Sequence, residues 1–168
     1  FEMTFPLRGA DGNFRPFLTR VIPLKNAAGR VLQWFGTNTD VDKLKRAEEA
    51  VRIAGERFRF MAESMPQKIF TALPNGDLDY FNQQWSDFTG LTLEQLRGQG
   101  WLQFVHPDDA EETSHRWKYS IKTGEYFELE HRFRRHDGEY RWNVSRAHAM
   151  RGDGGEITMW IGSNTDID

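Results

Sequence analysis

Apolar residues between Asp42 and Met65 recur seven positions apart in two interleaved series. This spacing fills positions a and d of a heptad and predicts one helix with a single apolar seam. Asp42 is suited to cap the first turn, and Pro66 ends the helix. The seam packs either against a second copy of the chain, as a short parallel coiled coil, or against the helix's own domain. The seam residues are Leu44, Ala47, Val51, Ala54, Phe58, Met61 and Met65.

Shorter patterns follow this helix. Runs of alternating polar and apolar residues predict strands, and Asn75-Gly76 between the first two runs is a hairpin signal. Polar starts and glycine breaks predict helices in the middle of the chain. The order of two strands, several helices and three strands indicates an α+β fold. The predicted strands are residues 68–73, 78–81, 127–135, 139–150 and 157–164, and the predicted helices are residues 82–88, 92–97 and 108–122.

Residues 1–42 are repeated without a gap in residues 127–168. The run Trp34-x-Gly-x-Asn-Thr-Asp40, for example, returns as Trp160-x-Gly-x-Asn-Thr-Asp166. Such a repeat indicates tandem copies of one structural unit, and we expect the chain to be a segment of a longer array. The expected parts are the second half of a preceding domain over 1–42, a linker helix over 43–65 and a complete domain over 66–168.

The composition is that of a folded protein with a sizeable core. Hydrophobic residues make up 38% of the sequence and include 13 Phe and 6 Trp. The absence of cysteine excludes disulfides, thiolate catalysis and any flavin or chromophore attached through sulfur. A net charge of −3 argues against nucleic acid as a partner, and no apolar run approaches the roughly 20 residues of a membrane helix. We expect this segment to be cytoplasmic, whether or not its parent is attached to a membrane.

The pair Asp137-Gly138 sets the register of the two strands around it. If it is a two-residue turn, Phe133 faces Trp142 and His131 faces Val144. Because side chains alternate along a strand, one face of these strands then meets the covering helices. The residues predicted on that face are Phe127, Leu129, His131, Phe133, Trp142, Val144, Arg146, His148 and Met150.

Three residues on that predicted inner face are polar: His131, Arg146 and His148. The first copy of the repeat has Phe5 and Ile22 at the two histidine positions, so the imidazoles are particular to the second copy. Ligand pockets commonly combine many apolar contacts with few polar ones, and these side chains could orient a small polar ligand. The alternative is that they bond to core carbonyls or lie at the rim of the sheet.

A series of short motifs runs in fixed order from Glu56 to Asp168. They are Glu56-Arg-Phe-Arg59, Tyr80-Phe-Asn82 with Trp85, Phe88-Thr-Gly90, Trp101-x-x-x-Val-His-Pro-Asp-Asp109, Thr123-Gly124, Arg134-x-x-Asp-Gly-x-x-Arg-Trp142 and Gly162-x-Asn-x-Asp-Ile-Asp168. The series resembles the PAS domain with its PAC half, in a version common in bacterial sensor kinases. Residues 1–42 match the PAC half alone. The resemblance implies a five-stranded antiparallel sheet of order 2-1-5-4-3, with helices on one face enclosing a small pocket.

The pocket implied by the resemblance would be lined mainly by aromatic side chains. Its cofactor is not identified: His115 does not stand where haem-binding relatives would place their ligand, and noncovalent flavin has no specific support. We predict no catalytic residue and no metal site within the segment. The candidate ligand-binding residues are Phe70, Trp85, Phe88, Trp101, His131, Phe133, Trp142, Arg146 and His148.

Two aspartate pairs, Asp40 with Asp42 and Asp166 with Asp168, stand where a strand passes into a helix. We expect them to be signal junctions. The favoured function is a sensory module of a multidomain bacterial sensor, most simply a two-component histidine kinase. The alternatives are a ligandless dimerisation and relay domain, or a regulatory domain of a cyclic-nucleotide signalling enzyme or transcriptional regulator. Expected partners are a second copy through the linker helix and sheet face, neighbouring PAS and output domains, and a small polar ligand.

Overall fold

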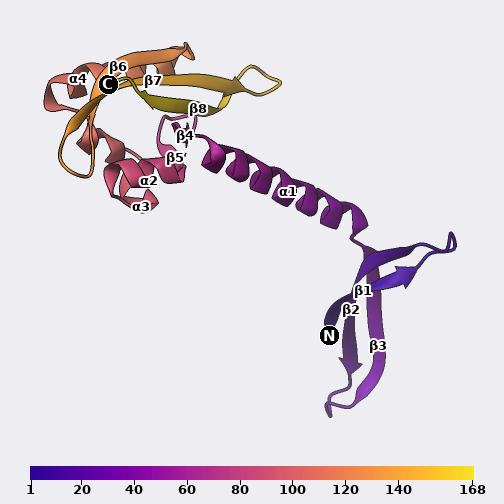
Figure 1. Cartoon of the computed structure of the whole chain (residues 1–168). Helices are drawn as coiled ribbons and strands as arrows, with labels where there is room; N and C mark the ends of the chain where they lie inside the picture. The colour runs from indigo at the N-terminus through magenta and orange to yellow at the C-terminus, as the bar shows by residue number, and fades with distance from the viewer. The chain divides into compact units, whose positions relative to one another are not determined.

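The computed structural model describes residues 1–168 and divides them into two units, residues 1–57 and 58–168. The long helix α1 (Asp42–Ser64) begins in the first unit and ends in the second (Figure 1). It begins at the predicted residue and ends one residue before the predicted Met65. None of the helices has both the length and the apolar composition needed to cross a membrane.

Five antiparallel strands form the sheet of the second unit. Their spatial order is β5-β4-β8-β7-β6, which confirms the predicted order 2-1-5-4-3. The last strand therefore lies in the middle of the sheet, between the first strand of the unit and β7. The strands are β4 (Lys68–Ala72), β5 (Leu78–Phe81), β6 (Phe127–Arg134), β7 (Tyr140–Arg151) and β8 (Ile157–Asp166).

Short helices connect β5 to β6. They are α2 (Gln83–Thr89), α3 (Leu93–Leu96), the 3-10 helix η1 (Gly100–Phe104) and α4 (Pro107–Thr123). A capping box between Thr92 and Gln95 starts α3. Pro107 starts α4, and the acidic residues of its first turn suit the positive end of the helix. The sequence predicted α2, α3 and α4 but not η1.

The core lies between the helices and one face of the sheet, which we call the inner face. Trp85, Phe133 and Trp160 are at most 1% exposed. The rings of Trp85 and Phe133 meet edge to face, with centroids 5.5 Å apart. Trp160 meets Trp117 of α4 in the same way, with centroids 5.2 Å apart. Such pairs add to the stabilisation that burial of large aromatic area already supplies. Aromatic side chains therefore make up much of this core.

The β6–β7 hairpin does not have the predicted two-residue turn. Arg135 N donates to Glu139 O at 2.8 Å and Gly138 N donates to Arg135 O at 2.9 Å, so the loop has three residues. Gly138 has a φ of +89°, the left-handed conformation that ends this type of loop. His131 consequently pairs with Asn143 instead of Val144. The predicted register was wrong by one residue, which turns every β7 side chain to the other face.

The first unit contains a three-stranded antiparallel sheet of β1 (Glu2–Arg8), β2 (Phe14–Lys25) and β3 (Val31–Asp40), in that spatial order. The register is that of β6, β7 and β8: Phe17 pairs with Asp40 as Asn143 pairs with Asp166. Both sheets also have an irregularity at the equivalent point of the middle strand. The sequence repeat is therefore a repeat of structure.

Equivalent positions in the two sheets differ strongly in burial. Trp160 is fully buried, whereas Trp34, its counterpart in the first unit, is 60% exposed. Phe127 is 4% exposed and its counterpart Phe1 is 70% exposed. The first unit thus has the sheet of the second without an equivalent apolar core.

Candidate functional site

A cavity of about 20 Å³ lies between the inner face and the helices. This is close to the smallest space that holds a single water, and far below the roughly 300 Å³ of an ordinary ligand pocket. Seven apolar side chains contribute to its wall together with three polar ones. The lining residues are Phe70, Leu78, Trp85, Trp101, Trp117, Phe127, His131, Phe133, Ser145 and Asn164.

His131 on β6 is the most buried titratable residue beside this cavity, with 1% of its surface exposed. Its Nδ1 lies 2.9 Å from Thr113 Oγ1 of α4, and its Nε2 lies 2.6 Å from Ser145 Oγ of β7. Burial lowers the pKa of His131 to about 4, and the negative charge of Asp109 only partly opposes this. The imidazole is therefore neutral at physiological pH and links α4 to β7.

Asp109 in the first turn of α4 fastens this helix to β6. Its carboxylate accepts hydrogen bonds from Arg132 Nε at 2.9 Å, from Arg132 Nη2 at 2.7 Å and from the Arg132 backbone N–H at 2.9 Å. The side-chain hydrogen bond from Arg132 is the main reason that the pKa of Asp109 lies below its usual value. This two-pronged contact fixes the end of α4 from which Thr113 reaches His131.

Lys68 is a further buried titratable residue, with 6% of its surface exposed. Its ammonium lies 4.1 Å above the centre of the Phe88 ring on α2. Burial lowers the pKa of Lys68 to about 8, and the charge of Asp166 partly counteracts this. Lys68 therefore contacts α2 from β4, and its charge is partly stabilised by Asp166 at the end of β8.

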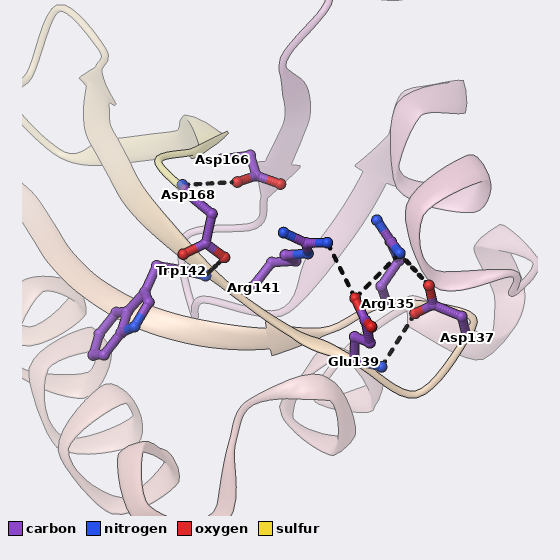
Figure 2. A network of polar contacts seen from close by, with 7 residues as sticks. All are labelled: Arg135, Asp137, Glu139, Arg141, Trp142, Asp166 and Asp168. Atoms are coloured by element: carbon purple, nitrogen blue, oxygen red, sulfur yellow. Dashed lines mark hydrogen bonds and ion pairs between the residues drawn. The ribbon is translucent and has the colours of Figure 1, made fainter.

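The end of β8 is held by hydrogen bonds to β7. Asp168 Oδ2 accepts from the Trp142 backbone N–H at 2.9 Å, and Ile167 N donates to Trp142 O at 3.0 Å. Asp168 N in turn donates to Asp166 Oδ1 at 3.1 Å. Figure 2 shows this junction and the β6–β7 hairpin. In the hairpin Arg135 forms ion pairs with Asp137 and Glu139, and Arg141 forms one with Glu139.

The first unit has two of these three hydrogen bonds at the end of β3, because Pro16 stands at the position of Trp142 and has no N–H to donate. Asp42 N donates to Asp40 Oδ1 at 2.9 Å, and Val41 N donates to Pro16 O at 3.0 Å. Here the chain continues directly into α1, and the Asp42 carboxylate pairs with Arg46 at 2.9 Å. Asp40, and not Asp42 as predicted, accepts from an otherwise free amide at the start of the helix. Asp40 and Asp166 are therefore the last residues of β3 and β8, Asp42 is the first residue of α1, and Asp168 lies two residues beyond β8.

Three predicted pocket residues lie on the outer face of the sheet, because β7 is shifted by one residue. Arg146 and His148 are exposed, and Trp142 is 42% exposed. Arg146 pairs with Glu128 at 2.8 Å, and the ring centroid of His148 lies 4.5 Å from that of Tyr126. The prediction that they share a face with His131 was wrong. Phe70, Trp85, Trp101, His131 and Phe133 do line the cavity, and Phe88 packs against the core beside it.

A second hollow, of about 390 Å³, lies on the outer face between the end of α1 and the sheet. Arg146 and His148 line it, together with Ile161 of β8. The last seam residues line it as well, namely Phe58 and Met61 of α1 and Met65, which follows the helix. Elsewhere on α1 the predicted seam is exposed, with Leu44 at 59% and Val51 at 74%. Ala47 and Ala54 of the seam are also exposed.

Sequence reasoning missed both residues that bond to His131, Thr113 on α4 and Ser145 on β7, and it also missed the buried residues Lys68 and Asn164. Thr113 and Ser145 carry no motif of their own, and Lys68 resembles an ordinary surface lysine at the start of a strand. Asn164 could have been found, because both copies of the repeat keep an asparagine in the same run. In the first copy Asn38 Oδ1 accepts from Thr19 Oγ1 at 2.5 Å, whereas the buried Oδ1 of Asn164 has no hydrogen-bond partner within the protein.

Comparison with known proteins agrees with this architecture. A family model described as "PAS fold" matches residues 78–164. The peroxide stress-activated histidine kinase mak1 of Schizosaccharomyces pombe is 34% identical over 177 residues, covering 96% of this chain and 11% of that protein. The uncharacterized protein y4lL of Sinorhizobium fredii is 30% identical over 166 residues, covering 99% of this chain and 20% of that protein. The chain thus spans a fifth or less of these curated relatives.

Solved structures share the fold at low sequence identity. The PAS domain of an HTR-like protein from Haloarcula marismortui superposes with a TM-score of 0.56 at 19% identity, covering 73% of this chain and 99% of that one. The N-terminal domain of a diguanylate cyclase with PAS/PAC sensor from Marinobacter aquaeolei gives a TM-score of 0.55 at 22% identity, covering 60% of this chain and 94% of that one.

Proposed function

The chain belongs to the PAS family, and from this premise we propose that residues 66–168 are the sensory PAS module of a larger two-component histidine kinase, with this part of the chain in the cytoplasm. In this proposal a change at the cavity or on the sheet alters the end of β8 and reaches the helix that follows it. The parent kinase, and not this segment, carries out the chemistry.

Two of the relatives support a kinase as the parent. The similarity to mak1, a histidine kinase, extends over 96% of this chain and so includes both sheets and α1. The two-component sensor PprA of Pseudomonas aeruginosa is 28% identical over 68% of this chain. Retention of the whole arrangement in a kinase favours a role in which both units and the connecting helix act together.

The junction is the observation that carries the proposal. In both sheets the last strand ends in two aspartates whose amide-to-carboxylate bond is the same, Asp42 N to Asp40 and Asp168 N to Asp166. In the first unit this arrangement leads directly into α1. Suppose that the strand end has two positions, and that a ligand or partner binds one of them more tightly. Binding would then shift the helix toward the corresponding state, by no more than the difference between the two binding free energies.

We propose that residues 1–42 are the PAC half of a preceding PAS domain. Their strands have the register of β6 to β8, and Trp34 and Phe1 are exposed where Trp160 and Phe127 are buried under helices. A large exposed apolar surface of this kind usually marks a site of contact with another protein segment. In a longer protein carrying the preceding residues, Trp34 should become as inaccessible to acrylamide quenching as Trp160.

We also propose that the module is a homodimer formed through the seam of α1 and the outer face of the sheet. The exposed heptad residues support this, and the hollow beside Met61 and Met65 continues the same apolar surface. Val51→Glu should convert dimer to monomer in sedimentation velocity. Ile53→Glu, which lies off the seam, is the matched control. An unchanged mass for Val51→Glu would contradict the proposal.

A ligandless relay remains the second candidate, because the cavity of about 20 Å³ is far smaller than an ordinary ligand pocket. Both candidates require signal transfer through the junction, which is tested in the full-length protein by measuring its autophosphorylation from ATP. Asp166→Ala should change the rate severalfold, and Asp153→Ala in a surface turn should not. Equal rates for the wild type and Asp166→Ala would argue against signal transfer through the junction.

A further inference from the structure

The last two turns of α1 are part of the folded second unit. The carboxylate of Glu63 accepts hydrogen bonds from Tyr80 Oη at 2.8 Å and from the Gln83 backbone N–H at 2.7 Å. Asn82 Nδ2 donates to Ala62 O at 2.8 Å, and Ala62 itself is buried. These contacts join the end of the helix to β5 and to the start of α2, so this end folds together with the second unit.

The rest of α1 has no comparable support within the chain. All fifteen residues from Lys43 to Arg57 are exposed. The ion pairs inside this stretch join Arg52 to Glu49 at 2.6 Å and to Glu56 at 2.5 Å. Exposed pairs of this kind stabilise a helix only weakly and are screened by salt. Because isolated helices of about 12–15 residues are marginal in water, this stretch is close to its limit of stability.

Gly55 weakens the exposed stretch further. Glycine in the interior of a helix is less favourable than alanine, because it loses more conformational freedom on folding. No packing contact within the chain requires glycine here, since a Cβ at this position would meet no atom within 4 Å. The glycine therefore lowers the stability of the helix and allows no close contact in exchange.

A second copy of the chain fits this stretch in shape and charge. Leu44 and Val51 of the seam are 59% and 74% exposed, and a parallel dimer would bury both. In the same dimer Lys43 of one copy lies beside Glu48 of the other, because these residues flank the seam on opposite sides, five positions apart. Neither residue forms an ion pair within its own chain. The free charges are therefore complementary between two copies.

We propose that residues 43–57 of α1 complete their helix only in the dimer, and that Gly55 keeps this stretch unstable in a single copy. The inference rests on the homodimer of the proposed function and adds a folding step to its formation. Helix formation and dimerisation are then one coupled equilibrium. A signal that separates the two copies would therefore also unwind the part of the chain that follows β3, which makes this stretch an order–disorder switch.

Glycine and alanine variants at one exposed position separate helix formation from seam packing. Glu49 lies on the side of α1 away from the seam, and Glu49→Ala and Glu49→Gly lose the same ion pair with Arg52. Under coupled folding, Glu49→Gly should have a dimer dissociation constant roughly 15–30-fold higher than Glu49→Ala in sedimentation equilibrium, because each dimer contains two such residues. Gly55→Ala should tighten the wild-type dimer by a similar factor. A helix already complete in one copy would give equal constants for the two Glu49 variants.

Amide exchange of the wild type observes the folding step without a variant. In a dilute sample the amides of residues 47–57 should exchange rapidly while those of residues 62–64 stay protected, and at high concentration both groups should be protected. Protection of residues 47–57 in the dilute monomer would overturn the inference. Failure of the proposed dimer is distinguishable, because the wild type would then sediment as a monomer at every concentration. A dimer whose two Glu49 variants associate equally well would refute only the coupled folding.

Discussion

Replacing Gly162 by alanine tests how tightly β8 is enclosed. A Cβ at this position would stand 2.5 Å from Arg146 O and 2.7 Å from Phe70 Cε1. The carbonyl belongs to the neighbouring strand of the ladder and cannot turn away, so the strand pair or the cavity wall must shift. Overpacking of this kind destabilises by about 1–3 kcal/mol, and the contact with backbone favours the upper part of that range. For a domain of this size we expect the midpoint of thermal unfolding to fall by roughly 10–20 °C.

The assay is urea or thermal unfolding followed by tryptophan fluorescence, since all the tryptophans except Trp34 lie in the second unit. Gly36→Ala is the matched control in the other copy: its Cβ would lie 3.4 Å from both Arg20 O and Val21 Cγ2, an ordinary contact distance. In a Phe70→Leu background Gly162→Ala should destabilise less, because part of the clash is removed. A Gly162→Ala protein as stable as the wild type would refute this account of the packing.

Three further predictions concern charged groups. Asp109→Asn should lower the free energy of unfolding by about 1–2 kcal/mol at pH 7 by weakening the contact with Arg132. Because the pKa of Asp109 is below its usual 3.8, the wild type has this stabilisation above pH 3.8 and loses it as pH falls through the folded value, so urea midpoints of the two proteins should converge in acid. Lys68→Met should be more stable than the wild type at pH 7. Between pH 8 and 10.5 the unfolded wild-type chain binds more protons than the folded one, so the stability of the wild type rises with pH. The difference in stability between Lys68→Met and the wild type should therefore shrink over this range. A difference that grows would contradict burial of the Lys68 charge. Asp168→Ala should speed amide exchange at Trp142, whereas Asp168→Asn, which keeps an acceptor, should leave it near the wild-type rate.

Patterns that depend on local spacing predicted the fold well. The heptad series located α1, and the alternating runs located the strands to within two residues at either end. The resemblance to PAS domains supplied the strand order, which local patterns cannot give, because pairing partners such as β4 and β8 are far apart in the sequence. The same resemblance led us to select Phe70 and Trp85 as pocket residues, and both line the cavity.

The errors came from one turn. An Asp-Gly pair is compatible with a two-residue loop and with the three-residue loop that the structure has, since both place glycine at positive φ. The two loops differ by one residue in register, and that difference moved Arg146 and His148 from the inner face to the outer one. His131, on the strand before the turn, was unaffected. The bonds around Thr113 and Ser145 depend on contacts between distant segments and left no pattern in the sequence.

The equivalence of the two aspartate junctions has a consequence for the origin of such chains. A block from Asp42 to Ile167 begins and ends at matching points of the two joints, so inserting a second copy of it would connect β8 to α1 through the two hydrogen bonds that both joints share. Unequal recombination between the repeats would then add one such block without creating a new kind of boundary. Arrays of different length could arise by this route with every remaining strand-to-helix connection unchanged.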